Sequence, residues 1–183
     1  MNVRQSKIEG LFFIELDIHD DSRGSFHEAW QAEKMEAQGL PHFVPVQSNV
    51  SESRRGTLRG IHAEPWEKYI HIPYGSVFGA WVDLREDSPT FGVVEQLQLD
   101  RTNAVYLPKG MGNSFQVTSD FALYSYLVTA HWQAGTVYPA VAFDDPDLAI
   151  AWPIAGDEQV VSEKDRSNPI MRQKYPHKYN QSL

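Results

Sequence analysis

The chain has 183 residues, a length typical of one domain, and 42% of them are hydrophobic, which is enough for an ordinary core. It contains no cysteine, which excludes disulfide frameworks, thiolate metal sites and thiol nucleophiles. Its 16 Lys and Arg residues against 24 Asp and Glu residues give a net charge of −8, so it lacks the basic field that nonspecific nucleic-acid binding requires. We therefore expect a single domain over residues 1–183 and no nucleic-acid partner.

The amino terminus, MNVRQSKIEG, carries charges without a following apolar run and does not resemble a signal peptide. The longest apolar stretch, residues 148–155, is interrupted by Pro153 and is far shorter than the roughly 18 residues of a membrane span. We expect a cytoplasmic protein without a membrane partner.

Short runs rich in Val, Ile, Tyr, Phe and Thr, separated by Gly, Pro, Asp and Asn, predict strands along most of the chain. The predicted strands span residues 10–16, 44–50, 57–61, 69–72, 77–84, 93–99, 104–107, 114–117 and 123–129. So many short strands are typical of a β-sandwich or barrel. One helix is expected over residues 30–38, and Ser162 followed by Asp165 predicts the cap of a short second helix.

The segment KYIHIPYGSVFGAWVDLR predicts a β-hairpin, because the residues Pro73-Tyr74-Gly75-Ser76 are typical of a tight turn. EDSPTFG predicts the next turn. Within the strand predicted to start at Thr57, Gly60 indicates a β-bulge.

Charged residues are concentrated in RGTLRGIHAEPWEKY, which otherwise has a strand-like pattern. Such charges often line a ligand cleft, although the same pattern is also typical of a solvated sheet face. Alternation along a strand places Lys68 on the same face as Ile70 and Ile72. A buried ammonium is unfavourable unless it is paired, so either the strand is solvated at its start or Lys68 addresses an internal ligand.

His62 is the best candidate for a general base because imidazole titrates near neutral pH, although a lone histidine is more often structural. Four carboxylates are candidates to orient it, and the sequence does not choose among Asp83, Asp144, Asp145 and Asp165. Position 64 is Glu, and His71 lies on the strand face opposite Lys68, so no second histidine stands at metal-ligand spacing. We expect no bound metal.

The segment LYSYLVTAHW places Tyr124 and Tyr126 on one strand face, with Trp132 after the strand. Such aromatics usually pack in a core, but a tyrosine can also act as a general acid and a tryptophan can stack on a base. In SRGSFHE, the guanidinium of Arg23 suits a phosphate, although the segment is also compatible with a simple turn.

Several segments in order resemble the dTDP-4-dehydrorhamnose 3,5-epimerase family: DSRGSFHE, VQSNVSESRRGTLRGIH, GSVFGAWVDLREDSPTFG, YLPKGMGNSFQV, YSYLV, DDPDLAIAWP and SEKDRSNP. The resemblance runs from about Ile8 to Pro169. It implies an all-β, cupin-like double-stranded β-helix, or jelly roll, with a few short peripheral helices. It also implies a homodimer without metal or cofactor that acts on a nucleotide-diphosphate 4-keto-6-deoxyhexose.

By this resemblance, His62 is the base, Asp165 its paired acid, Tyr126 the proton donor and Lys68 the group near the enolate. The substrate contacts that it implies are Arg23 and Glu28 from the other subunit, together with Gln47, Asn49, Arg59, Asn113, Trp132 and Lys164. Two departures touch the sugar pocket: Glu64 stands where the family usually has Gln, and Asn113 where it usually has His.

The expected function is 3,5-epimerisation of dTDP-4-dehydro-6-deoxyglucose through an enolate. The alternatives are an epimerase acting at C3 or C5 only, a CDP- or GDP-linked ketosugar as substrate, and a ketoisomerase. A non-catalytic sugar-nucleotide-binding jelly roll is a further alternative, because a fold alone does not imply activity.

Overall fold

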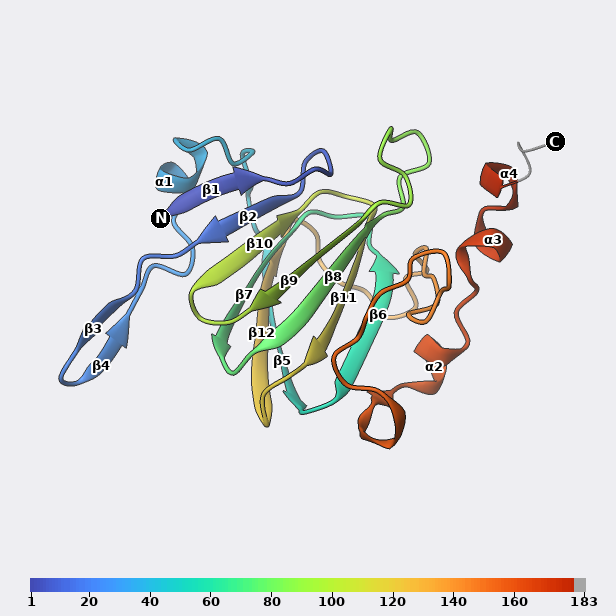
Figure 1. Cartoon of the computed structure of the whole chain (residues 1–183). Coiled ribbons are helices and arrows are strands. Elements are labelled where there is room, and N and C mark those ends of the chain that lie inside the picture. Colours follow the sequence, from blue (N-terminus) through green and yellow to red (C-terminus); the bar gives the residue numbers. More distant parts are fainter. Residues whose placement is uncertain (180–183) are drawn as a thin grey trace.

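The computed structural model describes residues 1–179, in which two β-sheets pack face to face (Figure 1). The larger sheet has the strand order β1-β2-β10-β7-β12-β5, and the smaller has the order β13-β6-β11-β8-β9. Residues 180–183 of the domain expected over residues 1–183 lie outside the described part.

The six-stranded sheet consists of β1 (Asn2–Gln5), β2 (Phe12–Glu15), β10 (Asn103–Leu107), β7 (Lys68–Tyr74), β12 (Phe121–Val128) and β5 (Gln47–Arg54). The five-stranded sheet consists of β13 (Val160–Val161), β6 (Thr57–Ala63), β11 (Met111–Val117), β8 (Val77–Asp83) and β9 (Val94–Leu99). A separate hairpin is formed by β3 (His19–Asp21) and β4 (Gly24–Phe26). The helices are short: α1 (Ala32–Glu36), the 3-10 helix η1 (Gly156–Glu158), α2 (Glu163–Arg166), α3 (Met171–Lys174) and α4 (Pro176–Tyr179). Among residues 1–179, no helix has the length and apolar character needed to cross a membrane.

From β5 to β8, consecutive strands alternate between the two sheets: β5 and β7 lie in the six-stranded sheet, and β6 and β8 in the five-stranded one. This alternation of antiparallel strands is that of a jelly roll, which confirms the predicted fold class.

The predicted hairpin around Gly75 is wrong, because β7 and β8 belong to different sheets. Each strand already has two other neighbours: β7 pairs with β10 and β12, and β8 pairs with β9 and β11. The tight turn is present, with Gly75 at a φ of 77°, but it carries the chain from one sheet to the other.

Each of the nine predicted strands exists, and the expected helix is α1. The strand predicted over residues 44–50 begins instead at Gln47 and continues to Arg54, because its exposed face is largely polar and gives little hydrophobic alternation. The sequence did not identify β1, β3, β4 or β13, which are short and partly or wholly exposed.

The core fills the space between the sheets. Ile70 and Ile72 of β7 face Trp81 of β8 and Phe115 of β11 in one buried cluster. The Phe115 ring stacks on Tyr124 of β12 with 3.9 Å between centroids, which joins the two sheets directly.

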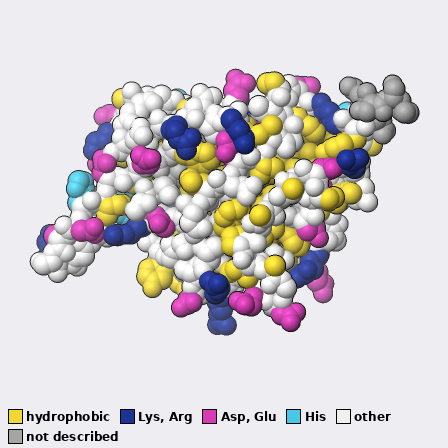
Figure 2. All heavy atoms as spheres, viewed as in Figure 1, with side chains coloured by type: hydrophobic (Ala, Val, Ile, Leu, Met, Phe, Trp, Pro, Cys, Tyr) yellow, Lys and Arg dark blue, Asp and Glu magenta, His cyan; other side chains and the backbone are white. Residues whose placement is uncertain are grey.

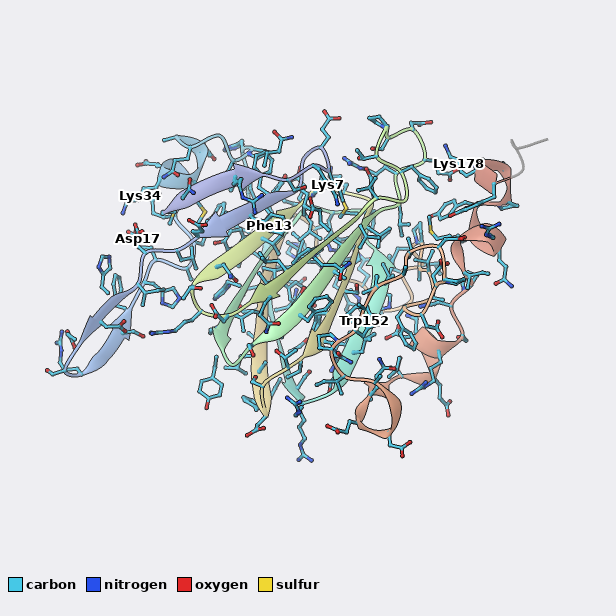
Figure 3. All side chains as sticks on the ribbon, viewed as in Figure 1. Lys7, Phe13, Asp17, Lys34, Trp152 and Lys178 are labelled. Carbon is cyan, nitrogen blue, oxygen red and sulfur yellow. The ribbon has the colours of Figure 1, made fainter. Side chains whose placement is uncertain are left out.

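The outer face of each sheet is covered by a different part of the chain. Met35 of α1 and the residues after it pack on the six-stranded sheet around Tyr69 and Tyr106. The chain after β12 covers the five-stranded sheet. In Figure 2, which views the molecule from the side of that sheet, hydrophobic side chains gather over the middle and right of this face. Trp152, labelled in Figure 3, lies there with its ring centroid 5.7 Å from that of Phe78 on β8.

Asp83, at the end of β8, organises the predicted EDSPTFG turn. Its buried carboxylate accepts hydrogen bonds from Arg85 Nε at 2.8 Å, from Ser88 Oγ at 2.5 Å and from Thr90 Oγ1 at 2.7 Å. Burial alone would raise the pKa of Asp83, but these hydrogen bonds outweigh burial and lower it to about 2.

Asp83→Asn is therefore expected to lower the free energy of unfolding by about 2 kcal/mol at pH 7. Because the pKa is lower in the folded chain, this stabilisation is complete above about pH 4 and disappears as the pH falls towards 2. Urea unfolding of the variant and the wild type between pH 7 and 3 measures both effects. Asp87→Asn, a change of an exposed carboxylate in the same turn, is the matched control. If Asp83→Asn lowered the free energy of unfolding equally at pH 7 and pH 3, the lowered pKa of Asp83 would not be the cause of the stabilisation.

Candidate active site

The site centres on His62 of β6 and Asp165 of α2, whose Nε2 and Oδ1 atoms lie 2.6 Å apart. Asp165 is buried, whereas the His62 side chain is 23% exposed and therefore within reach of a ligand. Because a carboxylate only accepts hydrogen bonds, Nε2 carries the proton and Nδ1 is the basic nitrogen.

The short helix α2 fixes Asp165. Ser162 caps the helix as predicted, with its Oγ accepting from the Asp165 backbone N–H at 3.1 Å. Burial alone would raise the pKa of Asp165, but the hydrogen bond and charge of His62, with further bonds from Ser162 and Gly60, hold it below its usual range. The carboxylate is thus ionised at neutral pH and orients the imidazole.

A β-bulge at Gly60 brings Arg59 and His62 to the same face of β6. Arg59 pairs with Phe115 and His62 pairs with Asn113, so two residues of β6 lie opposite one residue of β11. Gly60 has a φ of 118°, and a Cβ there would lie 2.6 Å from the Asn113 carbonyl oxygen. The predicted bulge is confirmed, and it requires glycine.

Lys68 and Tyr126 meet on the inner face of the six-stranded sheet. Lys68 is buried beside Ile70, and its Nζ lies 4.6 Å from the centroid of the Tyr126 ring. The ammonium is paired with the carboxylate of Glu64. Burial raises the pKa of Tyr126, and the charge of Glu64 adds to the rise, so this phenol keeps its proton at neutral pH.

Asn113 links the His62 side of the site to the Tyr126 side. Its Oδ1 accepts hydrogen bonds from Trp81 Nε1 at 3.0 Å and from the Tyr124 hydroxyl at 3.1 Å. The Tyr124 ring lies edge-on to Tyr126, with 6.0 Å between centroids. Asn113 therefore connects β11, which pairs with β6, to β12.

A second phenol, Tyr138, lies against His62 with 5.8 Å between ring centroids. The loop that carries it is pinned to β6, because Ala63 N–H donates to the Pro139 carbonyl at 2.8 Å and Val141 N–H to the Ile61 carbonyl at 3.2 Å. Tyr138 was not predicted as a site residue, because it stands in a loop where the sequence shows no periodicity. Lys164 Nζ lies 5.8 Å from the centroid of the same ring, which places this predicted contact at the site.

Three further predicted contacts form a group at the edge of the six-stranded sheet. On β5, Gln47 Nε2 donates to Asn49 Oδ1 at 2.7 Å. Gln47 Oε1 accepts from the Trp132 backbone N–H at 3.0 Å, which fixes the start of the loop after β12. Trp132 is 54% exposed, so part of this residue is accessible to a ligand.

Arg23 and Glu28 are not brought to His62 within one chain. They belong to or follow the β3–β4 hairpin, which projects from the opposite end of the sandwich from β6 (Figure 1). Arg23 pairs with Asp21 and Glu28 with Lys34.

The other carboxylates considered as partners of His62 do not pair with it, and Asp144 is exposed. Asp83 holds the turn after β8, and buried Asp145 accepts from the backbone N–H groups of Asp147 and Leu148. Within residues 1–179, no three His, Asp or Glu side chains are grouped so that they could hold a metal ion. The residues that are brought together supply an oriented imidazole, two phenols and a buried ammonium, a set suited to moving protons.

Comparison with known proteins gives consistent matches. The sequence model of the family described as dTDP-4-dehydrorhamnose 3,5-epimerase matches residues 5–173. A relative called "Protein RmlC homolog", from Streptococcus pyogenes serotype M6, is 42% identical over 94% of this chain and 90% of its own length. A dTDP-4-dehydro-6-deoxyglucose 3-epimerase from a Streptomyces species is 38% identical over 90% of this chain and 86% of its own length.

Among solved structures, RmlC from Streptococcus suis in complex with dTDP-D-xylose has a TM-score of 0.90 with this chain. The two are 41% identical, with 96% of this chain and 93% of the other covered.

Proposed function

The chain belongs to the dTDP-4-dehydrorhamnose 3,5-epimerase family, and from this we propose that it epimerises a dTDP-linked 4-keto-6-deoxyhexose at C3 and C5. It is an isomerase that acts on a nucleotide sugar. The observation that carries the proposal is the 2.6 Å pair of His62 and Asp165, and the Lys68 ammonium 4.6 Å from the centroid of the Tyr126 ring supports it.

The 4-keto group of such a sugar acidifies the hydrogens at C3 and C5, because the carbanion left by proton removal is delocalised as an enolate. His62 accepts the proton at Nδ1, while Asp165 holds the ring and stabilises the imidazolium that forms. The bond broken is C–H, and its electron pair moves to the carbonyl oxygen.

Lys68 stabilises the negative charge that develops on this oxygen, in the way of an oxyanion donor. Tyr126 then delivers a proton to the carbon from the other face of the sugar ring, which inverts the centre. The Tyr126 phenolate is reprotonated from solvent, and His62 releases its proton before the second centre reacts.

The remaining predicted contacts are assigned to the rest of the substrate, with Asn113 in the sugar pocket. Lys164, Arg59, Asn113, Gln47 and Asn49 supply polar groups around the site, and Trp132 supplies a ring face for the base. We also propose that the protein is a homodimer in which Arg23 and Glu28, on or after the exposed β3–β4 hairpin, reach the partner's nucleotide.

Incubation with dTDP-, CDP- and GDP-linked 4-keto-6-deoxyhexoses in deuterated water, followed by NMR, tests this function. The expected result is a preference for the dTDP sugar, with deuterium at both C3 and C5 and inversion at both. A product in which the carbonyl has moved to C3 would identify a ketoisomerase instead. Binding of the sugar without any exchange would support a non-catalytic role.

A single-centre epimerase is the second candidate, because the Streptomyces relative at 38% identity is a 3-epimerase. The same experiment decides between the two, since deuterium confined to one carbon would identify this narrower activity.

Trp132→Ala is expected to raise the KM for the dTDP sugar about 5- to 150-fold, the range that corresponds to loss of one base-stacking contact. The kcat is expected to stay within about twofold, because stacking on the base binds the substrate and transition state equally. Steady-state kinetics measures both constants. Trp132→Tyr, which keeps a stacking ring, is the matched control and should behave like the wild type. An unchanged KM in Trp132→Ala would remove this residue from nucleotide binding.

A further inference from the structure

The ion pair between Glu64 and Lys68 lies inside the protein. Their side chains are 13% and 7% exposed, and they stand at the two ends of the short connection between β6 and β7. The Glu64 backbone carbonyl accepts from the Gly110 N–H at 3.0 Å, which ties this end of the connection to the turn before β11. Charged side chains are rarely buried unless they are paired, so the burial of either charge is tolerated only because the other is present.

Lys68 has little freedom within this arrangement. It lies at the start of the inner face of β7, where it pairs with Leu107 of β10 and Val128 of β12. Its Nζ is held between the Glu64 carboxylate and the Tyr126 ring, 4.6 Å from the ring centroid. Lys68 therefore lies between the Glu64 carboxylate and the phenol that returns a proton in the proposed reaction.

We propose that Glu64 is a positioning residue that keeps both the Lys68 ammonium and the Tyr126 phenol in their protonated, proton-donating forms while it holds Lys68 in place. This inference rests on the proposed function, in which Lys68 faces the developing enolate and Tyr126 returns a proton. A neutral lysine would not stabilise the enolate charge, and a phenolate would have no proton to give.

The electrostatics of the site support this role. Burial lowers the pKa of Lys68, and the charge and hydrogen bond of Glu64 raise it in part. Burial raises the pKa of Tyr126, and the Glu64 charge raises it further. The same negative charge thus protects the proton on both groups. The other titratable or charged groups around the pair are Arg59, His62, Tyr124, Tyr138 and Asp165.

Glu64→Gln tests the inference, because it keeps the size of the side chain and removes its charge. The alkaline limb of the pH profile of kcat is expected to move about 1 to 3 pH units lower, since loss of a close opposite charge weakens proton binding by Lys68. Above the new midpoint, kcat is expected to fall about 10²- to 10³-fold, as for loss of an oxyanion donor. Glu64→Asp, which restores the charge, should recover most of the alkaline activity.

Glu67→Gln is the matched control in the same connection. The Glu67 carboxylate interacts with Tyr106, which belongs to the cluster on the outer face of the six-stranded sheet. This variant should keep the wild-type pH profile. A Glu64→Gln variant that folds and also keeps the wild-type profile would overturn the inference.

A measurement without turnover separates this inference from the proposed function. The titration midpoint of Lys68, followed by NMR of its labelled Cε, should be about 1 to 3 pH units lower in Glu64→Gln than in the wild type. Thermal unfolding gives a second measurement. Lys68→Met should lower Tm, because it leaves the Glu64 carboxylate buried and unpaired. The double variant Lys68→Met, Glu64→Gln should recover part of this loss in Tm. An unchanged Lys68 midpoint would overturn the inference about Glu64, whereas a wild-type chain that converts no ketosugar would contradict the proposed function.

Discussion

Replacement of His62 by Asn is expected to lower kcat by about 10²- to 10⁴-fold, the range for loss of a positioned general base. Asn can still donate a hydrogen bond towards Asp165, but it cannot accept a proton from carbon. The loss should therefore appear in the first chemical step. In deuterated water, the variant should exchange neither the C3 nor the C5 hydrogen of the substrate, and one-dimensional proton NMR measures this directly.

The binding of dTDP should be nearly unchanged in His62→Asn, because the imidazole acts on the sugar carbons and not on the nucleotide. His71→Asn is the matched control: His71 is on β7, at the position between inward-facing Ile70 and Ile72, and should keep full activity. A folded His62→Asn protein that exchanges substrate hydrogens at the wild-type rate would remove His62 from the role of base.

Tyr126→Phe is expected to separate proton exchange from inversion. His62 can still remove a proton and return it to the same face, so deuterium exchange into the substrate should continue. Delivery to the other face loses its donor, so the rate of inversion is expected to fall about 10²- to 10⁴-fold. The ratio of exchanged to inverted sugar, measured by NMR over time, should rise by the same factor.

Tyr74→Phe, at the exposed end of β7, is the control for removing a phenol hydroxyl and should leave the ratio unchanged. If exchange and inversion fell together in Tyr126→Phe, the phenol would be acting before the enolate forms, as a donor to the keto oxygen. That outcome would contradict its assignment as the acid that completes inversion.

The strands were predictable because alternation of apolar and polar residues survives wherever one face is buried. The position of Lys68 among Ile70 and Ile72 also indicated an inward-facing ammonium, and the structure buries it. Which strands pair with each other was harder to predict from the sequence. The sequence of the turn at Gly75 is the same whether the two flanking strands pair with each other or belong to different sheets. The predicted hairpin was wrong because β7 and β8 pair with strands that are distant in sequence.

The site was predictable only in part. The Ser162 cap signalled the helix that carries Asp165, but the choice of Asp165 over Asp83 and Asp145 needed either the family resemblance or the fold, because residues 62 and 165 are 103 positions apart. Tyr138 gave no signal, since its place beside His62 depends on backbone bonds between a loop and β6. The role of Glu64 was equally hidden, because nothing in the sequence shows that its charge meets Lys68 in the interior.

A crystal structure of the protein with a bound dTDP-hexose that lacks the 4-keto group, and therefore cannot react, tests directly whether His62 and Tyr126 act on opposite faces of the sugar. We expect His62 Nδ1 and the Tyr126 hydroxyl on opposite faces of the sugar ring, each within about 3 to 3.5 Å of a hydrogen-bearing position at C3 or C5. Both groups on one face, a His62 side chain pointing away from the sugar, or a metal ion bound to His62 would contradict these roles of His62 and Tyr126.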